Sequence, residues 1–216
     1  MFIAGVDTSA NTMNWALAEL LANPDEMRKV QEELDEIVGM GRMVDEDDLP
    51  KLKYLRAIIK EVFRLHPVAV MMIPHTSKED CEIEVLTTND DGTSKTSNYR
   101  IPSRTRVFIN LWAIGRDEHM WEQANEFKPK RFMNNAIDLK GQNFELLPFG
   151  SGRRMCPGMN QGLHIVELTL ANILHCFHWS PTTSTIDLSE SKSTAGSLTL
   201  ATPLLVFPKF RLDINN

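Results

Sequence analysis

The chain has 216 residues, of which 42% are hydrophobic and 24% are charged, as in a soluble folded protein with a sizeable core. Its 23 basic and 29 acidic residues give a formal charge of -6, which argues against nucleic-acid binding as the default function. Three cysteines are too few for a disulfide scaffold and suit a reducing compartment. No apolar run has the length of a transmembrane helix, and the first residues do not form a signal peptide.

The first third of the chain is predicted to be helical. Apolar residues recur every three or four positions over Phe2–Ala22, which indicates a helix with a wide apolar face. A second, solvent-facing helix is expected over Pro24–Val38, with Asn23 as its N-cap and Glu26 as a capping-box acid. A third helix is expected over residues 52–65, because Pro67 disfavours helical geometry at His66.

Short strands are predicted after the third helix. Apolar and polar residues alternate over residues 81–86 as in a half-buried strand, and residues 106–111 have the pattern of another strand. Between them, residues 89–92 carry a hairpin turn signal, which is followed by a polar stretch that ends at Asn98.

The rest of the chain is predicted to combine loops with one long helix. Residues 112–158 are rich in Pro, Gly and Asn and lack periodicity, which favours ordered loops and short turns. The final helix is expected over residues 159–177, and a last strand over residues 203–207. The predicted fold class is therefore mainly α with small β-sheets, in one domain.

The loop at residues 149–158 carries the most chemical information. Its three glycines let the backbone approach a ligand closely or adopt positive φ. Cys156 comes just before the final helix, and Pro157 is suited to open that helix. The helix dipole, together with Arg153 and Arg154, favours the thiolate form of this cysteine. Such a thiolate can be a redox thiol, a nucleophile or a metal ligand.

Other interpretations of this loop are less favoured. A buried structural role is the commoner one for a lone cysteine, but the electropositive, glycine-rich setting argues against it here. A phosphate-binding loop is excluded because the third glycine of the dinucleotide pattern and a Gly-Lys-Ser/Thr sequence are both missing. A zinc site would need a second cysteine two to four residues away, whereas Cys176 falls in the final helix.

Five residues of the loop carry a resemblance to a known family. Phe149, Gly152, Arg154, Cys156 and Gly158 match every defined position of the haem-binding signature of cytochrome P450 monooxygenases. The resemblance implies that Cys156 is the axial thiolate ligand of the iron in haem b and that Arg154 pairs with a haem propionate. The phenylalanine and the two glycines are further cofactor-binding positions. An axial thiolate donates electron density to the iron and favours O–O cleavage.

Residues 4–9 resemble the oxygen-activation motif in the long central helix of the same family. There Thr8 would hydrogen-bond the oxygen bound at the iron, and Asp7 would help to deliver protons. A mid-helix threonine that bonds back to the carbonyl of Ala4 can open the helix locally. Taken alone, such residues are more often surface side chains or hydroxyls satisfied by their own backbone.

Glu61 and Arg64 lie three residues apart on one predicted helical face. For an isolated pair, the simplest interpretation is a solvent-exposed ion pair of little energetic weight. The resemblance implies instead that the pair is buried and bound to Arg131, next to Lys130, which stands where the family often has Glu. The three residues would form a structural network that shapes the cysteine loop and would not be catalytic.

Two features depart from the family pattern. His75 stands where many relatives have an arginine for a haem propionate; its ring N–H could serve the same carboxylate, and the alternative is a surface histidine. Residues 84–98 exceed the corresponding hairpin of most relatives, which suggests a mobile polar insertion or a gene-model artefact. The segments around Tyr99 and Trp112 resemble plant microsomal members in particular.

The resemblance implies that residues 1–216 are the C-terminal portion of a single cytochrome P450 domain, with its haem-binding loop at residues 149–158. The expected reaction inserts one oxygen atom from O2 into a hydrophobic organic substrate of secondary metabolism. The alternatives are a truncated, catalytically inactive haem-binding remnant and, more weakly, a cysteine redox protein without haem.

Partners and location follow from the same resemblance. Electrons would come from NADPH through an NADPH-cytochrome reductase, and six basic against two acidic residues at positions 127–158 suit a docking face for that acidic partner. Full-length relatives are anchored to the endoplasmic reticulum membrane and face the cytosol. This chain has no anchor and is otherwise expected to be soluble and intracellular, without a nucleic-acid partner.

Overall fold

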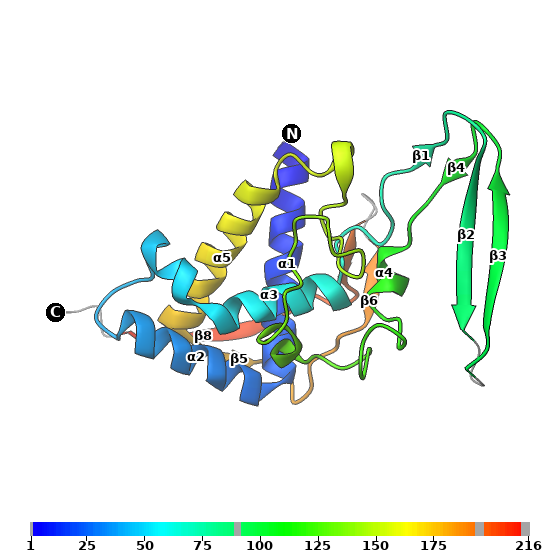
Figure 1. Cartoon of the computed structure of the whole chain (residues 1–216). Coiled ribbons are helices and arrows are strands. Elements are labelled where there is room, and N and C mark those ends of the chain that lie inside the picture. Colours follow the sequence, from blue (N-terminus) through cyan, green and yellow to red (C-terminus); the bar gives the residue numbers. More distant parts are fainter. Residues whose placement is uncertain (1, 89–91, 193–196, 213–216) are drawn as a thin grey trace. The chain divides into compact units, whose positions relative to one another are not determined.

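The computed structural model describes residues 2–88, 92–192 and 197–212, which form two compact units (Figure 1). The larger unit combines Met1–Val70 with Leu111–Asn216, and the smaller unit is Met71–Asn110. Long helices dominate the larger unit, and short antiparallel strands make up the smaller one. The predicted fold class, mainly α with small β-sheets, is confirmed.

The long helices of the larger unit pack around one apolar core. They are α1 (Phe2–Ala22), α2 (Pro24–Val38), α3 (Lys53–Leu65) and α5 (Met159–Cys176). Helix α1 contacts each of the other three. Fully buried side chains from all four helices meet in the core: Trp15, Leu20, Leu34, Leu55, Ile58, Leu170 and Leu174. Burial of each such side chain stabilises the fold by about 1.5–3 kcal/mol.

The helix bounds agree with the prediction to within one residue, and Asn23 is the N-cap residue of α2, but the predicted capping box does not form. The Asn23 side chain makes no capping bond and instead donates to the carbonyl and the carboxylate of Glu19, at 2.9 and 3.2 Å. The Glu26 carboxylate pairs with Lys29 at 2.6 Å. Because both side chains find partners outside the cap, the start of α2 is set by the proline at its first position rather than by a capping box.

Short elements connect the long helices. They are the 3₁₀ helices η1 (Glu46–Lys51), η2 (Pro129–Phe132) and η3 (Gly152–Arg154) and the one-turn helix α4 (Leu111–Ile114). The loop-rich character predicted for this region is confirmed. The predicted strand over residues 106–111 is too long, because α4 already begins at its last residue.

Two small antiparallel sheets complete the larger unit. Strand β5 (Phe177–Pro181) pairs with β8 (Val206–Phe210), and β6 (Glu190–Lys192) pairs with β7 (Leu198–Leu200). The last strand was predicted over residues 203–207 and therefore lies three residues further along the chain. The first and last side chains of β7 are buried in the core, so this strand is part of the helical body.

The smaller unit consists of two strand pairs. Strand β1 (His75–Thr76) pairs with β4 (Arg106–Val107), and β2 (Cys81–Thr88) pairs with β3 (Ser94–Ile101) in a continuous register. The polar stretch that follows the predicted turn, interpreted as part of a polar insertion, forms most of strand β3. Most of the predicted turn at residues 89–92 lies outside the described residues.

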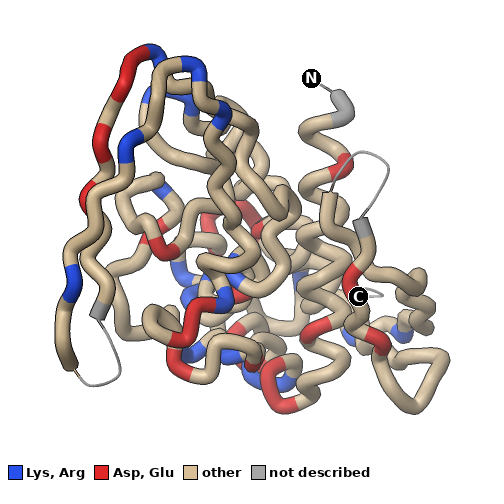
Figure 2. The backbone as a smooth tube through the Cα atoms, turned by 90° about the vertical axis from the view of Figure 1, so that its right-hand side faces the viewer, with Lys and Arg blue, Asp and Glu red and all other residues tan. Residues whose placement is uncertain are grey.

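Charged residues of both signs are interspersed along the backbone of both units (Figure 2). In the larger unit, Arg28 pairs with Glu32 at 2.8 Å along α2. In the smaller unit, Arg100 pairs with Asp80 at 2.6 Å.

Among the described residues, no helix combines the length and the apolar character needed to cross a bilayer.

Candidate haem-binding site

The backbone of the cysteine loop is shaped by two glycines and closed by hydrogen bonds. Gly150 and Gly152 have φ of 75° and 70°, a conformation that side-chain-bearing residues rarely adopt. The Cys156 amide donates to the Phe149 carbonyl at 2.9 Å, and the Met155 amide donates to the Gly152 carbonyl at 3.1 Å. These bonds turn the chain back on itself and leave Cys156 exposed just before α5.

A neighbouring loop supports the cysteine loop through Gly141, which the sequence analysis missed. A Cβ at this position would lie 2.8 Å from the Gly150 carbonyl oxygen and 3.2 Å from the Met155 sulfur. The Ser151 hydroxyl donates to the Gly141 carbonyl at 2.5 Å. Only glycine therefore fits here. The sole signal in the sequence was a glycine in a loop, which does not say what approaches it.

The exposed side chains of the loop fit a haem. Cys156, Arg154 and Gly158 are all exposed, so a ligand can reach the thiol and the guanidinium. Helix α5 begins at Met159, so Pro157 precedes the helix rather than opening it. A Cβ at position 158 would come 3.9 Å from the Cys156 sulfur, so glycine leaves room beside the sulfur. A thiolate suits iron and a guanidinium suits a propionate, so the donor set matches the cofactor.

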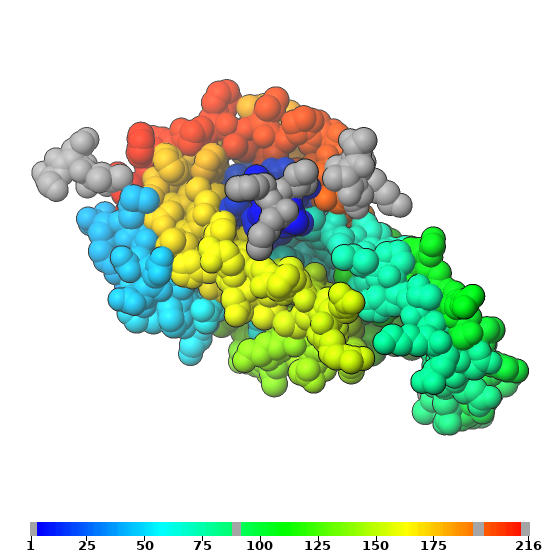
Figure 3. All heavy atoms as spheres, turned by 90° about the horizontal axis from the view of Figure 1, so that it is seen from above, coloured from blue at the N-terminus to red at the C-terminus, as the bar shows by residue number. Residues whose placement is uncertain are grey.

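The start of α1 lies at the same end of the larger unit as the start of α5 in both Figure 1 and Figure 3. There the Thr8 hydroxyl donates to the Ala4 carbonyl at 2.6 Å, as the mid-helix position predicts. The half-buried Asp7 accepts a hydrogen bond from the Ser197 hydroxyl at 3.0 Å. Thr8 itself is exposed. Both predicted catalytic side chains therefore lie at the end of the unit that carries the cysteine loop.

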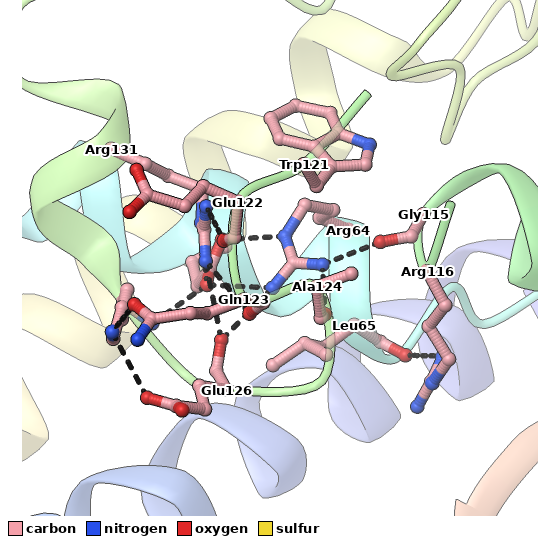
Figure 4. Close-up of polar contacts among 12 residues, drawn as sticks. Arg64, Leu65, Gly115, Arg116, Trp121, Glu122, Gln123, Ala124, Glu126 and Arg131 are labelled. Atoms are coloured by element: carbon pink, nitrogen blue, oxygen red, sulfur yellow. Dashed lines mark hydrogen bonds and ion pairs between the residues drawn. The ribbon is translucent and has the colours of Figure 1, made fainter. Parts of the chain in front are cut away.

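Glu61 and Arg64 of α3 form one network with Arg131 of η2. Figure 4 shows Arg64 and Arg131 with the backbone carbonyls around them. Both carboxylate oxygens of Glu61 accept hydrogen bonds from Arg64, each at 2.8 Å, and Arg131 donates to Glu61 at 3.1 Å. The Glu61 and Arg64 side chains have no exposed surface. Arg64 also donates to the carbonyls of Gly115 and Ala124, at 2.5 and 2.6 Å. The interpretation of a solvent-exposed pair is therefore wrong.

The same region of α3 contacts the cysteine loop. The Phe63 ring meets the Phe149 ring edge-to-face, with centroids 5.3 Å apart. On the other side, a Cβ at Gly115 would lie 2.1 Å from the Arg64 carbonyl oxygen, so only glycine allows this approach. Gly115 is a second supporting residue that the sequence did not reveal, because the backbone it touches is 51 residues away. Helix α3 thus connects the buried network to the loop.

The remaining predicted features are His75 and the basic residues at positions 127–158. His75 is exposed on β1 in the smaller unit, opposite Val107. Among the basic residues at positions 127–158, Lys128 pairs with Glu126 at 3.0 Å and Arg131 belongs to the buried network. The remaining bases are exposed: Lys130, Lys140, Arg153 and Arg154.

The larger unit thus combines a glycine-shaped loop with an exposed cysteine and a buried Glu-Arg-Arg network on α3 and η2. The family model described as Cytochrome P450 matches residues 1–207, and the chain belongs to this family. Family membership implies a haem cofactor.

Known relatives agree in sequence and in structure. Cytochrome P450 71A1 of Persea americana is 48% identical over 195 residues, which are 88% of this chain and 36% of that protein. Flavonoid 3'-monooxygenase of Petunia hybrida is 40% identical over 219 residues, 99% of this chain and 40% of that protein. A solved zebrafish cytochrome P450 with progesterone has a TM-score of 0.75 at 33% identity, over 96% of this chain and 44% of that chain. The chain thus spans less than half the length of these relatives.

Proposed function

We propose that the protein is a haem-dependent monooxygenase that inserts one oxygen atom from O2 into a hydrophobic organic substrate. The observation that carries this proposal is the exposed Cys156 thiol on a loop that matches the haem-binding signature at every defined position. One relative is named for a flavonoid, and one similar structure was solved with progesterone. These names support a hydrophobic organic substrate, and the plant relatives suit one made in secondary metabolism.

The bound haem supplies the chemistry of O2 activation. Cys156 would ligate the haem iron through its thiolate, and the exposed Arg154 would pair with a propionate. By the family resemblance, His75 would donate its ring N–H to a haem propionate. The buried network of Glu61, Arg64 and Arg131 touches none of the reactants and serves only to keep the cysteine loop in shape.

Two side chains at the start of α1 handle protons. The Thr8 hydroxyl donates to the Ala4 carbonyl at 2.6 Å, which leaves its oxygen lone pairs on the exposed side of the helix free to accept. The neighbouring Asp7 carboxylate is half-buried, so it contacts both solvent and the protein interior and can pass a proton between them.

The proposal also covers the redox partner and the subcellular location. An NADPH-cytochrome reductase delivers electrons, and the exposed bases around the cysteine loop attract its acidic surface. The full protein is held at the endoplasmic reticulum membrane, as a microsomal relative would be. Residues 1–216 belong to a single cytochrome P450 domain with its haem loop at residues 149–158.

A turnover assay with labelled oxygen tests this proposal. The haem-loaded protein is mixed with NADPH, a plant reductase and a panel of flavonoids under 18O2, and products are analysed by mass spectrometry. One 18O atom per product is expected. Thr8→Ala should consume NADPH with less product, whereas Thr169→Ala, an exposed threonine on α5, should behave as the parent. Haem uptake without a labelled product from any substrate would support the inactive haem-binding remnant instead.

A further inference from the structure

A buried histidine outside the candidate haem site bridges two carboxylates. His66 follows α3 directly, and its Nδ1 lies 3.1 Å from Oε1 of Glu190 on β6. Its Nε2 lies 2.7 Å from Oε1 of Glu19 on α1. The His66 and Glu19 side chains are each 5% exposed, so water does not satisfy these contacts. A neutral imidazole donates through only one nitrogen, so one proton more than usual must reside in this cluster.

The hydrogen bonds to Glu190 indicate that this carboxylate is ionised. Besides His66, Trp112 donates to it at 2.8 Å and Arg116 at 2.7 Å. Burial alone would raise the pKa of Glu190, but the hydrogen bonds from His66 and Trp112 and the charge of Arg116 outweigh burial and leave the pKa lowered. Glu190 therefore accepts from His66 and does not supply the extra proton.

The contacts around Glu19 and the His66 ring also favour a positive charge on His66. The second carboxylate oxygen of Glu19 accepts from the Asn23 amide at 3.2 Å, and its first oxygen lies 2.7 Å from Nε2 of His66. The Trp15 ring stacks on His66 with centroids 3.8 Å apart and planes 2° from parallel. The face of an indole favours a cation over a neutral ring. Two carboxyl groups, those of Glu19 and Glu190, thus face His66, and Arg116 lies behind Glu190. This arrangement favours a positive charge on His66.

We infer that His66 is a positioning residue that, as an imidazolium, joins α1 to β6 and thereby holds β7 beside Asp7. The connection runs through the β6–β7 sheet, in which Glu190 pairs with Leu200. At the other end of β7, the Ser197 hydroxyl donates to Asp7 at 3.0 Å. The role of Asp7 in proton delivery rests on the proposed function, whereas the bridge itself does not.

Two hydrogen bonds of Leu198 hold strand β7 to its neighbours. The Leu198 amide donates to the Val68 carbonyl at 2.8 Å. The Leu198 carbonyl accepts from the Trp15 indole at 3.1 Å, and Trp15 is the ring that stacks on His66. Loosening the Glu190 anchor should therefore expose the Leu198 amide to solvent more often.

Nuclear magnetic resonance tests the charge on His66. The 216-residue chain is labelled with 15N-histidine, and long-range 1H–15N spectra are recorded at neutral pH without haem. His66, assigned through contacts with the Trp15 ring, should have protons on both nitrogens. His175 is an internal contrast: its Nε2 lies 3.0 Å from the Gly39 carbonyl oxygen and burial lowers its pKa, so only one nitrogen should carry a proton. A single proton on His66 would overturn the inference.

Hydrogen exchange tests the positioning role. In Glu190→Gln the Leu198 amide should exchange about ten- to a hundredfold faster, because a charge-assisted hydrogen bond is weakened. Glu32→Gln, which alters an exposed glutamate on α2, should leave that amide unchanged. Unchanged exchange in a folded Glu190→Gln chain would contradict the role. Neither experiment uses haem or turnover. A negative result in either experiment would therefore leave the proposed function standing, and failure of the proposed function would leave the His66 bridge standing.

Discussion

Replacing Glu61 with Gln keeps the shape of this side chain and removes one negative charge from the buried network. Its carboxylate accepts two bonds from Arg64 at 2.8 Å, one from Arg131 at 3.1 Å and one from the Lys128 amide at 2.7 Å. The fully buried Arg64 would lose its counter-charge, and an amide N–H would face arginine donors. Removing one partner of a buried ion pair costs about 3–5 kcal/mol. The free energy of unfolding should fall by that amount.

Urea unfolding followed by circular dichroism measures this change against a matched control. Glu32→Gln makes the same chemical change in an ion pair on α2, where Glu32 accepts from Arg28 at 2.8 Å but remains 60% exposed. Because solvent screens this pair, the urea midpoint of the control variant should equal that of the parent chain. Equal shifts of the urea midpoint in the two variants would refute the claim that the Glu61 network stabilises the fold because it is buried.

Three further predictions concern one glycine and two titrating groups. Gly115→Ala should destabilise the fold by about 1–3 kcal/mol, because the new Cβ would lie 2.1 Å from a backbone oxygen of α3. Gly162→Ala in α5, with nothing within 4 Å, should instead raise the Tm, and thermal unfolding compares the two. A hydrogen bond from Arg42 lowers the pKa of Asp48 from 3.8 to about 2. The ionised Asp48 therefore stabilises the fold above pH 3.8, and this contribution is lost as the pH falls toward 2. The difference in unfolding free energy between the parent chain and Asp48→Asn should shrink over that range. Burial lowers the pKa of His175 below 6.5, so stability should fall as the pH drops below that value, and His175→Gln should flatten the slope.

The helices were predictable because each buries one face and so carries a period of 3.6 residues in its apolar positions. Strand β3 has no such signal: nearly every side chain of Ser94–Ile101 is exposed, so neither face of the strand is marked by apolar residues. The missing side-chain capping bond of α2 has a different cause. Asn23 was the expected residue type, but the end of α1 offered its amide a carbonyl and a carboxylate instead.

The cysteine loop was predictable because its chemistry is local: the five signature residues lie within ten positions. Its supports were not, because they depend on contacts between distant segments. Gly141 meets the loop across a turn, and Gly115 meets the backbone of α3. The spacing of Glu61 and Arg64 predicts a pair, but only the fold decides that the pair is buried.

The bridge at His66 illustrates the same limit. Its partners come from positions 19 and 190, and the arginine behind it from position 116. Nothing in the order of the residues brings these groups together. A histidine before a proline reads as the end of a helix, and its two carboxylate partners become visible only once α1 and β6 are in place.

The carbon monoxide difference spectrum tests most directly whether Cys156 is a haem-thiolate ligand. Haem is added to the purified chain, the iron is reduced, and the spectrum is recorded with and without carbon monoxide. The red-shifted band of a thiolate-ligated haem should form in the parent chain and in Cys81→Ser, whose cysteine is also exposed. It should vanish in Cys156→Ser. Absence of the band from the parent chain, or its persistence in Cys156→Ser, would contradict this assignment.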